Sequence, residues 1–175
     1  TDSLVYTIGV IGINEMVQYH TGYQLHESKE AFRLAVRVMT ELEMYAKNLS
    51  KKYGMQIALA RTPAETTGQR FAVSDLLQKE FVNRAEQVIK GNVETAKQKL
   101  NKEHDLPVYY TNGTHIPPSA DISIIDRINY EHTFFPIVDG GNIMHIWMGE
   151  SHPDPKGLKQ FALNIAKNTQ TGYFA

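Results

Sequence analysis

"QIALARTPAETTGQRFAVSDL", residues 56–76, is the stretch that decides the fold. It begins with a short apolar strand at residues 57–60, passes through a polar turn and continues into a helical segment. A buried strand that leads directly into a helix is the basic unit of α/β proteins. The turn is rich in hydroxyl groups, since it carries Thr62, Thr66 and Thr67, and two arginines flank it, Arg61 and Arg70.

A junction of this kind is a natural binding site for an anion. The first N–H groups of a helix have no partner within the helix, and the aligned peptide dipoles place partial positive charge there. Thr66 and Thr67 can donate hydroxyl groups or cap the helix, and Gly68 permits a ligand to approach the backbone closely. Arg61 and Arg70 can each bind phosphate oxygens in a bidentate manner. The loop therefore predicts a phosphate site.

Glu65 fits this interpretation least well, because a carboxylate repels phosphate. If a nucleotide binds, Glu65 is expected to face ribose hydroxyls or a backbone amide. The alternative stays open that "TPAETTG" is a proline-containing turn with a threonine N-cap and no ligand, because the loop lacks the Walker glycine pattern and its lysine.

The segments before this stretch predict a strand and a long helix. Residues 4–13 are β-branched and apolar, which predicts a strand buried on both faces that ends in a loop or short helix at residues 14–19. Ser28 is a good N-cap and Gly54 a good stop signal for a helix between them. Its expected apolar stripe consists of Leu34, Val38, Leu42, Tyr45 and Leu49.

The remaining segments continue the alternation of strands and helices. A second long helix is expected after Ser74, a polar helix at 92–104, a third strand at 106–113 and helix signals from Ser119 or Asp121. A fourth strand is expected at 140–150 and a last helix at 155–169. The pattern predicts an α/β fold with mostly parallel strands. Four strands cannot close a barrel alone, so we expect an open sheet or an arc of a larger one.

Composition restricts the function. The 175 residues include 18 basic and 19 acidic side chains, so a strongly basic nucleic-acid groove is not expected. Cysteine is absent, which excludes disulfides, thiolate metal sites and thiol nucleophiles from this chain, and a reducing cytoplasm is the expected compartment. No apolar run is long enough to cross a membrane, and the first residues do not resemble a secretory signal.

Histidine and aromatic residues supply further candidates. The seven histidines show no spacing typical of a zinc site. His145 alternates with Ile143 and Trp147 on one face of the expected strand, which favours a hydrogen-bonded core histidine over a ligand. Tyr110 and Asn112 stand at the end of the expected third strand, where α/β proteins place ligand contacts. An aromatic strand followed by a reverse turn explains this pair equally well.

Five segments in order resemble the late part of the catalytic barrel of anaerobic (class III) ribonucleotide reductases. They are "GVIGINEMVQYHTG", "LARTPAETTGQRFA", "LPVYYTNGTHIP", "GGNIMHIWMGE" and "IAKNTQTGYFA". The family belongs to the glycyl-radical superfamily, whose fold is a ten-stranded α/β barrel of two half-barrels. The resemblance implies that residues 1–175 are a single domain, most of the second half-barrel, with about four strands that alternate with helices. The sequence is less similar to the glycyl-radical lyases, such as formate acetyltransferase, than to the reductases.

The resemblance implies reduction of ribonucleotides, usually triphosphates, to 2′-deoxyribonucleotides by radical chemistry, with formate or a thiol system as reductant. The barrel loop that corresponds to "TPAETTG" is then expected to bind the substrate phosphates. The resemblance and the physical argument therefore both predict phosphate binding by the same residues, Ala64, Glu65, Thr66, Thr67 and Gly68. With them, Arg61, Thr62, Arg70, Tyr110 and Asn112 complete the predicted substrate-binding set, and no catalytic residue is assigned.

The family's thiyl cysteine, cysteine-ligated zinc site and glycyl-radical loop have no counterpart in this cysteine-free chain. We therefore expect a fragment of a larger barrel, inactive alone. The full-length protein is expected to carry a glycyl radical and a zinc ion and to form a homodimer. Its expected partners are a ribonucleoside triphosphate and an activase that uses S-adenosylmethionine and an iron–sulfur cluster. A non-catalytic nucleotide-binding or self-associating scaffold module remains the alternative.

Overall fold

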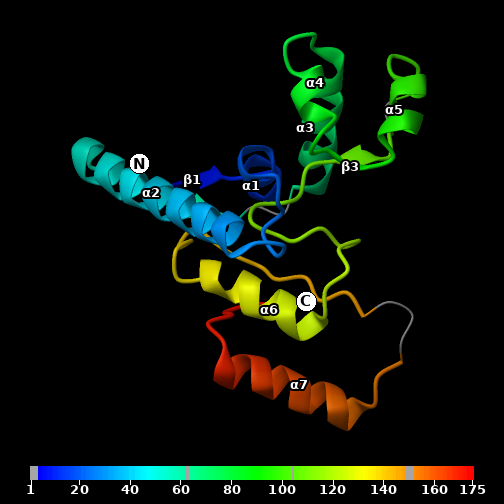
Figure 1. The fold of residues 1–175 in the computed structure, drawn as a ribbon. Coiled ribbons are helices and arrows are strands. Elements are labelled where there is room, and N and C mark those ends of the chain that lie inside the picture. Colours follow the sequence, from blue (N-terminus) through cyan, green and yellow to red (C-terminus); the bar gives the residue numbers. More distant parts are fainter. Residues whose placement is uncertain (1–3, 62–63, 104, 149–151) are drawn as a thin grey trace.

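The computed structural model describes residues 4–61, 64–103, 105–148 and 152–175, and Thr62 therefore lies outside the described residues. Helices dominate a mixed α/β fold (Figure 1). The first half contains β1 (Val5–Gly9), α1 (Ile13–Thr21), α2 (Lys29–Tyr53), β2 (Gln56–Ala60), α3 (Glu65–Leu77) and α4 (Val82–Ala85). The second half contains β3 (Lys90–Gly91), α5 (Val93–Lys99), β4 (Val108–Tyr109), α6 (Ile124–Glu131), the 3₁₀ helix η1 (His132–Phe134) and α7 (Pro155–Asn168).

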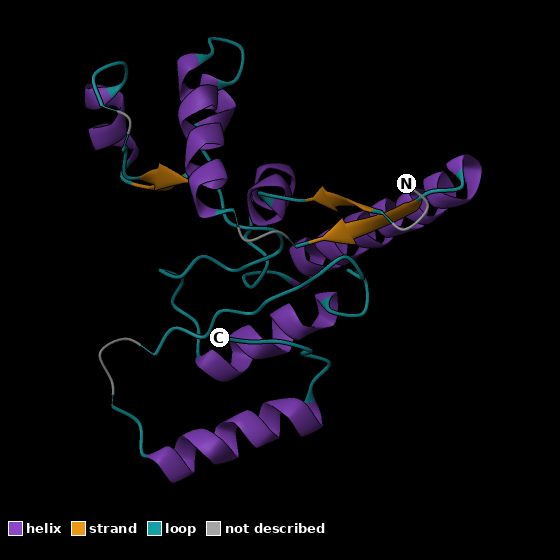
Figure 2. Ribbon diagram, turned by 180° about the vertical axis from the view of Figure 1, so that it is seen from behind, coloured by secondary structure: helices purple, strands orange, loops and turns teal. Residues whose placement is uncertain are grey.

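The first sheet pairs β1 with β2 in parallel, from Val5 opposite Gln56 to Gly9 opposite Ala60. The long helix α2 runs beside these strands (Figure 2). All five residues of β1 are exposed, so the prediction of a strand buried on both faces is wrong for the described residues. An apolar strand is buried only where another element covers its faces, and among the described residues only β2 pairs with β1.

Helix α2 confirms the predicted ends but not the predicted stripe. The Ser28 hydroxyl accepts the N–H of Glu30, and Gly54 adopts a left-handed conformation with φ of 63°. The buried face consists of three alanines, one methionine and one carboxylate, namely Ala31, Ala35, Ala46, Met39 and Glu43. Leu42 and Tyr45 of the predicted stripe are exposed. The small alanine side chains let α2 approach α1 and β2 closely. The buried face of α2 is therefore the face with small side chains.

Helix α3 begins at Glu65, earlier than the predicted helix after Ser74. Thr66 and Thr67 therefore lie in its first turn. The short helix α4 follows as a separate element, and the predicted single helix that continued to Val88 is wrong. Helix α3 packs against β4 and shares one apolar cluster with α4, α5 and that strand.

The third and fourth predicted strands are mostly extended chain rather than regular strands. The third strand is reduced to β4, which pairs antiparallel with β3. The fourth, at 140–150, forms only single bridges. Gly140 N–H binds Leu59 O at 2.8 Å, and farther along Met144 pairs with Phe174. Among the described residues, a regular parallel strand pair is therefore confirmed for β1 and β2, and Met144 adds one parallel bridge to Phe174.

Helices α3, α4 and α5 lie at one end of the molecule and α7 at the other, with α2 and α6 between them (Figure 1). Three apolar clusters form the core. One lies between α1, α2 and the segment around Phe134, a second under α3, and a third between α6, α7 and Met144. Within the described part of the chain, none of the helices is both long and apolar enough to cross a membrane.

Candidate functional site

A partly open cavity of about 220 Å³ lies where three separate segments of the chain meet. One wall is the segment that follows β4, and we call residues 110–116 the cavity loop. The opposite wall is the extended chain at His145 and Trp147, and α6 contributes Arg127 and Glu131. Most of the exposed lining area is apolar, although several of the lining residues carry polar groups, and such a combination is typical of a small-molecule site.

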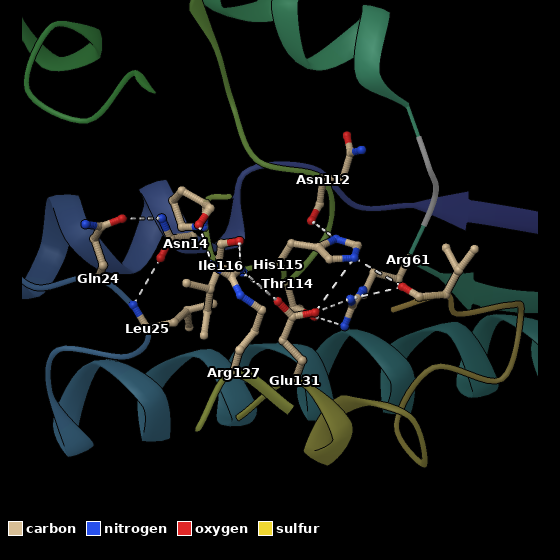
Figure 3. A network of polar contacts seen from close by, with 12 residues as sticks. Asn14, Gln24, Leu25, Arg61, Asn112, Thr114, His115, Ile116, Arg127 and Glu131 are labelled. Carbon is tan, nitrogen blue, oxygen red and sulfur yellow. Dashed lines mark hydrogen bonds and ion pairs between the residues drawn. The ribbon is translucent and has the colours of Figure 1, made fainter. Parts of the chain in front are cut away.

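A buried ion pair connects the end of β2 with α6 beside this cavity. Arg61 Nη2 donates to Glu131 Oε2 at 2.8 Å, and neither side chain is more than 1% exposed (Figure 3). Arg61 also donates to the hydroxyl of Thr114 at 3.2 Å and to the carbonyl of Ile143 at 3.1 Å. A buried charge pair is tolerated when such additional hydrogen bonds satisfy it.

Glu131 and Arg127 of α6 make further contacts that attach the cavity loop to this helix. The second carboxylate oxygen of Glu131 accepts the N–H of Ile116 at 3.1 Å. Arg127, one helical turn earlier, donates to the carbonyls of Ile116 at 2.6 Å and Pro117 at 2.9 Å. The backbone at the end of the cavity loop is therefore bound through both its N–H and its C=O groups.

Gly113 is required by the position of Arg61. It adopts a φ of +47°, and a Cβ atom built on it would lie 2.1 Å from Arg61 Cγ. Only glycine combines this backbone conformation with so close a contact. The backbone of the cavity loop therefore packs directly against the Arg61 side chain at Gly113.

His115 lies between the ion pair and the aromatic wall. Its ring nitrogens are 2.8 Å from the carbonyl oxygen of Asn112 and 3.1 Å from that of Ile143. Burial, with the nearby Arg61 charge, lowers the pKa of His115 to about 3 although both carbonyls favour the protonated ring. The neutral ring donates to one of the two carbonyls only. Its neighbour His145 stacks in turn on Trp147, with ring centroids 5.8 Å apart.

Glu15 of α1 holds the opposite end of the cavity loop. Its Oε2 accepts the hydroxyl of Thr111 at 2.8 Å and the N–H of Thr111 at 3.2 Å. Burial raises the pKa of Glu15, and the hydrogen bond from Thr111 offsets part of that rise. Gly12, at the start of α1, also donates its N–H to the carbonyl of Thr111 at 2.8 Å.

The first turn of α3 lies directly beside the cavity loop. A Cβ atom on Gly68 would be 2.5 Å from the carbonyl oxygen of Tyr110 and 3.8 Å from Asn112 Oδ1. The N–H of Tyr110 donates to the carbonyl of Gly68 at 3.2 Å. Gly68 therefore permits contact between two chain segments, which is a different use from the ligand approach that we predicted.

The N–H groups of Thr66 and Thr67 have no acceptor among the described residues. Thr66 is exposed and, with Gln69, lines two adjoining hollows on the surface of α3. Tyr109 lines one of these hollows and also the cavity. The start of α3 and the cavity are therefore neighbours in space.

The other predicted binding residues are distributed differently. Asn112 lines the cavity, and its amide has no hydrogen-bond partner in the described part of the chain. Tyr110 also lines it, but its hydroxyl donates to Asp75 at 2.8 Å, and burial with this contact raises the pKa of Tyr110. Arg70 is exposed on α3, and Arg61 is bound to Glu131. Ala64 is the residue before α3, and Glu65 opens the helix.

Sequence reasoning missed the buried charged residues Glu15, Arg127 and Glu131. Glu131 follows Arg61 by 70 positions, and no local pattern links them. A helix is expected from Ser119 or Asp121, and the four-residue spacing of Arg127 and Glu131 within it is the signal that could have placed them on one face. His145, predicted to be a core residue, lines the cavity.

The residues present do not fit the metal or radical groups that the resemblance implies. The chain has no cysteine, so it can form neither a thiyl group nor a cysteine-ligated zinc site. Within the described ranges, no three histidine or acidic side chains cluster as metal ligands.

Comparison with known proteins identifies the family. The family model "Anaerobic ribonucleoside-triphosphate reductase" matches residues 1–175. A curated enzyme of that name from Haemophilus influenzae is 25% identical over 141 residues, which cover 79% of this chain and 17% of the relative.

Solved structures show the same fold. An anaerobic ribonucleotide reductase superposes with a TM-score of 0.73 and 20% identity over 99% of this chain and 24% of that one. The Thermotoga maritima reductase with glycerol in the active site gives a TM-score of 0.69 and 19% identity, over 97% and 24% of the two chains. The same enzyme with citrate in the active site gives 0.66 and 20%, over 97% and 27%. Since the family model spans every residue, the chain belongs to the anaerobic ribonucleoside-triphosphate reductase family.

Proposed function

We propose that this chain is part of an anaerobic reductase that converts ribonucleoside triphosphates to 2′-deoxyribonucleotides, and that it provides the phosphate side of the substrate site. The observation that supports the proposal is the first turn of α3. Two adjacent threonines lie there, whose N–H groups have no acceptor among the described residues, and Thr66 lines a surface hollow that shares Tyr109 with the cavity. A helix start with unpaired N–H groups and hydroxyls suits the phosphates of a nucleotide.

The cavity suits the rest of a nucleotide. Asn112 offers an amide with free donors and acceptors, which matches hydroxyl groups of a ribose. His145 and Trp147 provide flat apolar surface for a ring. Among the residues we predicted, Arg61 acts indirectly in this proposal, by holding the cavity loop, whereas Arg70 remains available to a phosphate from the outer face of α3.

The radical steps belong to segments outside these residues. In the full-length protein, the glycyl radical supplies the oxidising equivalent that starts reduction, and an activase generates it. This chain has no group that fits those steps, so its residues bind the substrate, orient it and exclude water. Consistent with this role, it spans 17% of its curated relative and 24% of the first solved structure that it matches.

The arc of a barrel that we expected is part of the same proposal. Backbone hydrogen bonds join β2 to residues 140–141, and residues 144–146 to the end of the chain at 173–175. Just after β1, Ile11 forms an antiparallel bridge with Asn112. These links would make one curved wall once the remaining strands are present.

The proposal is tested by removing the two hydroxyls from the full-length reductase. Thr66→Val with Thr67→Val keeps side-chain volume and should raise the Kd for CTP by at least about 100-fold, because each of the two lost hydrogen bonds to a charged group contributes about 1.5–3 kcal/mol. Equilibrium dialysis before radical generation measures this value.

Thr40→Val is the matched control, since it removes a hydroxyl from the exposed surface of α2. The same Kd for the double variant, the control and the unchanged protein would defeat the proposal.

The scaffold alternative also draws on one observation, the exposed face of β1. Sedimentation of the full-length protein with and without nucleotide measures its self-association and so distinguishes the scaffold from the reductase. A protein that neither binds CTP nor reduces it, but self-associates, is the scaffold.

A further inference from the structure

We infer that Glu131 and Arg61 are positioning residues for Asn112, which they hold in the orientation that contacts the substrate in the cavity. The inference rests on the proposed function. It adds a role for two residues that do not reach the substrate themselves.

The first step is that the ion pair acts on the cavity loop. Glu131 binds Arg61 through one carboxylate oxygen and the N–H of Ile116 through the other. Arg61 in turn donates to the hydroxyl of Thr114. Both charged groups therefore bind the same short segment, and both are buried.

The second step is that the cavity loop is fixed at both ends. Glu15 accepts hydrogen bonds from the N–H and the hydroxyl of Thr111. Glu131 accepts a hydrogen bond from the N–H of Ile116. Between these points the His115 ring approaches the carbonyl of Asn112 at 2.8 Å. Buried carboxylates are costly unless they are fully used, and here each one is used on the backbone of this loop.

The third step is that one polar side chain of the fixed segment remains free. The Asn112 amide lines the cavity and makes no hydrogen bond within the described residues. It points away from the ion pair (Figure 3). An amide without a partner, on a backbone held from both sides, is a preorganised contact for a ligand hydroxyl or phosphate oxygen.

A double-mutant cycle in the full-length reductase tests whether Glu131 acts through Asn112. The measurement is the Kd for CTP in equilibrium dialysis before radical generation, for Glu131→Gln, Asn112→Ala and the combination. We expect each single variant to raise the Kd about tenfold. The combination should bind as Asn112→Ala does, because Glu131 then has no contact left to orient.

Glu43→Gln is the matched control, since it converts a buried carboxylate on a different helix, α2, to its amide. It should leave the Kd unchanged. If Glu131→Gln does not fold, Thr114→Val replaces it in the same cycle, because it removes only the hydroxyl that accepts from Arg61.

Three results would overturn the inference. They are losses that multiply in the double variant, a Kd unchanged by Asn112→Ala, or an equal loss in Glu43→Gln. The Thr66→Val, Thr67→Val variant separates this failure from that of the proposed function. If it weakens CTP binding while the cycle shows no coupling, only the inference fails, and if it has no effect, the proposed function fails.

Discussion

Arg61 and Glu131 illustrate, at the scale of single residues, why this site needs several groups at once. Each is at most 1% exposed, and removal of water from either charge is costly. Burial raises the pKa of Glu131, and the Arg61 charge offsets part of the rise. Loss of one partner from such a pair costs about 3–5 kcal/mol, because the other charge remains buried. Thr114, Ile116 and the Ile143 carbonyl share the hydrogen bonds that keep the pair tolerable.

His115 should make the protein less stable in mild acid. Its pKa is about 3 in the folded state and 6.5 without the fold, so the unfolded chain binds the extra proton between these values. Stability from this group is complete above pH 6.5 and falls as the pH drops toward 3, by up to about 1.4 kcal/mol per pH unit. Glu15 and Glu131, with raised pKa values, act in the opposite direction.

The measurement is therefore a comparison of slopes. Thermal unfolding between pH 7 and pH 5 should show a shallower loss of stability for His115→Gln than for the unchanged protein. Parallel pH profiles would mean that His115 is protonated in the fold.

At the scale of elements, the contact between α3 and the cavity loop controls where the helix start lies. The carbonyl of Gly68 accepts the N–H of Tyr110, and the two backbones are too close for a side chain between them. This contact places the first turn of α3 beside Asn112.

Gly68→Ala should separate these two elements. The added Cβ lies 2.5 Å from the Tyr110 carbonyl, and overpacking of this kind costs about 1–3 kcal/mol. We expect faster hydrogen exchange in peptides that cover 65–77 and 108–112, measured by mass spectrometry. Gly157→Ala in α7 is the control, because its Cβ would meet nothing closer than 3.7 Å, and it should not change exchange there. Equal exchange in both variants would contradict the contact.

The sequence predicted individual elements better than their surroundings. Ser28 and Gly54 marked the ends of α2 correctly because caps are local. The buried face of α2 was missed because alanines carry little hydrophobic signal, whereas Leu42 and Tyr45 carry much. The loop at 61–70 could be noticed from its residue types. Its link to Glu131 could not, because that contact joins positions 70 residues apart through the tertiary fold.

At the scale of the whole molecule, the proposed function makes this chain one wall of a site that other segments of the full-length protein complete. All five residues of β1 are exposed, and its curated relative is several times longer than the match. An apolar strand left open in this way requires a partner. In the proposed reductase the remaining strands of the barrel cover it and close the cavity from the outer side of Trp147.

The most direct measurement is an experimental structure of the full-length reductase with a bound ribonucleoside triphosphate. The account predicts phosphate oxygens within about 3 Å of the N–H groups and hydroxyls of Thr66 and Thr67, the usual distance for such hydrogen bonds. It also predicts the Asn112 amide against the nucleoside. A structure in which the nucleotide occupies the active site, while its phosphates lie away from the first turn of α3, would contradict it.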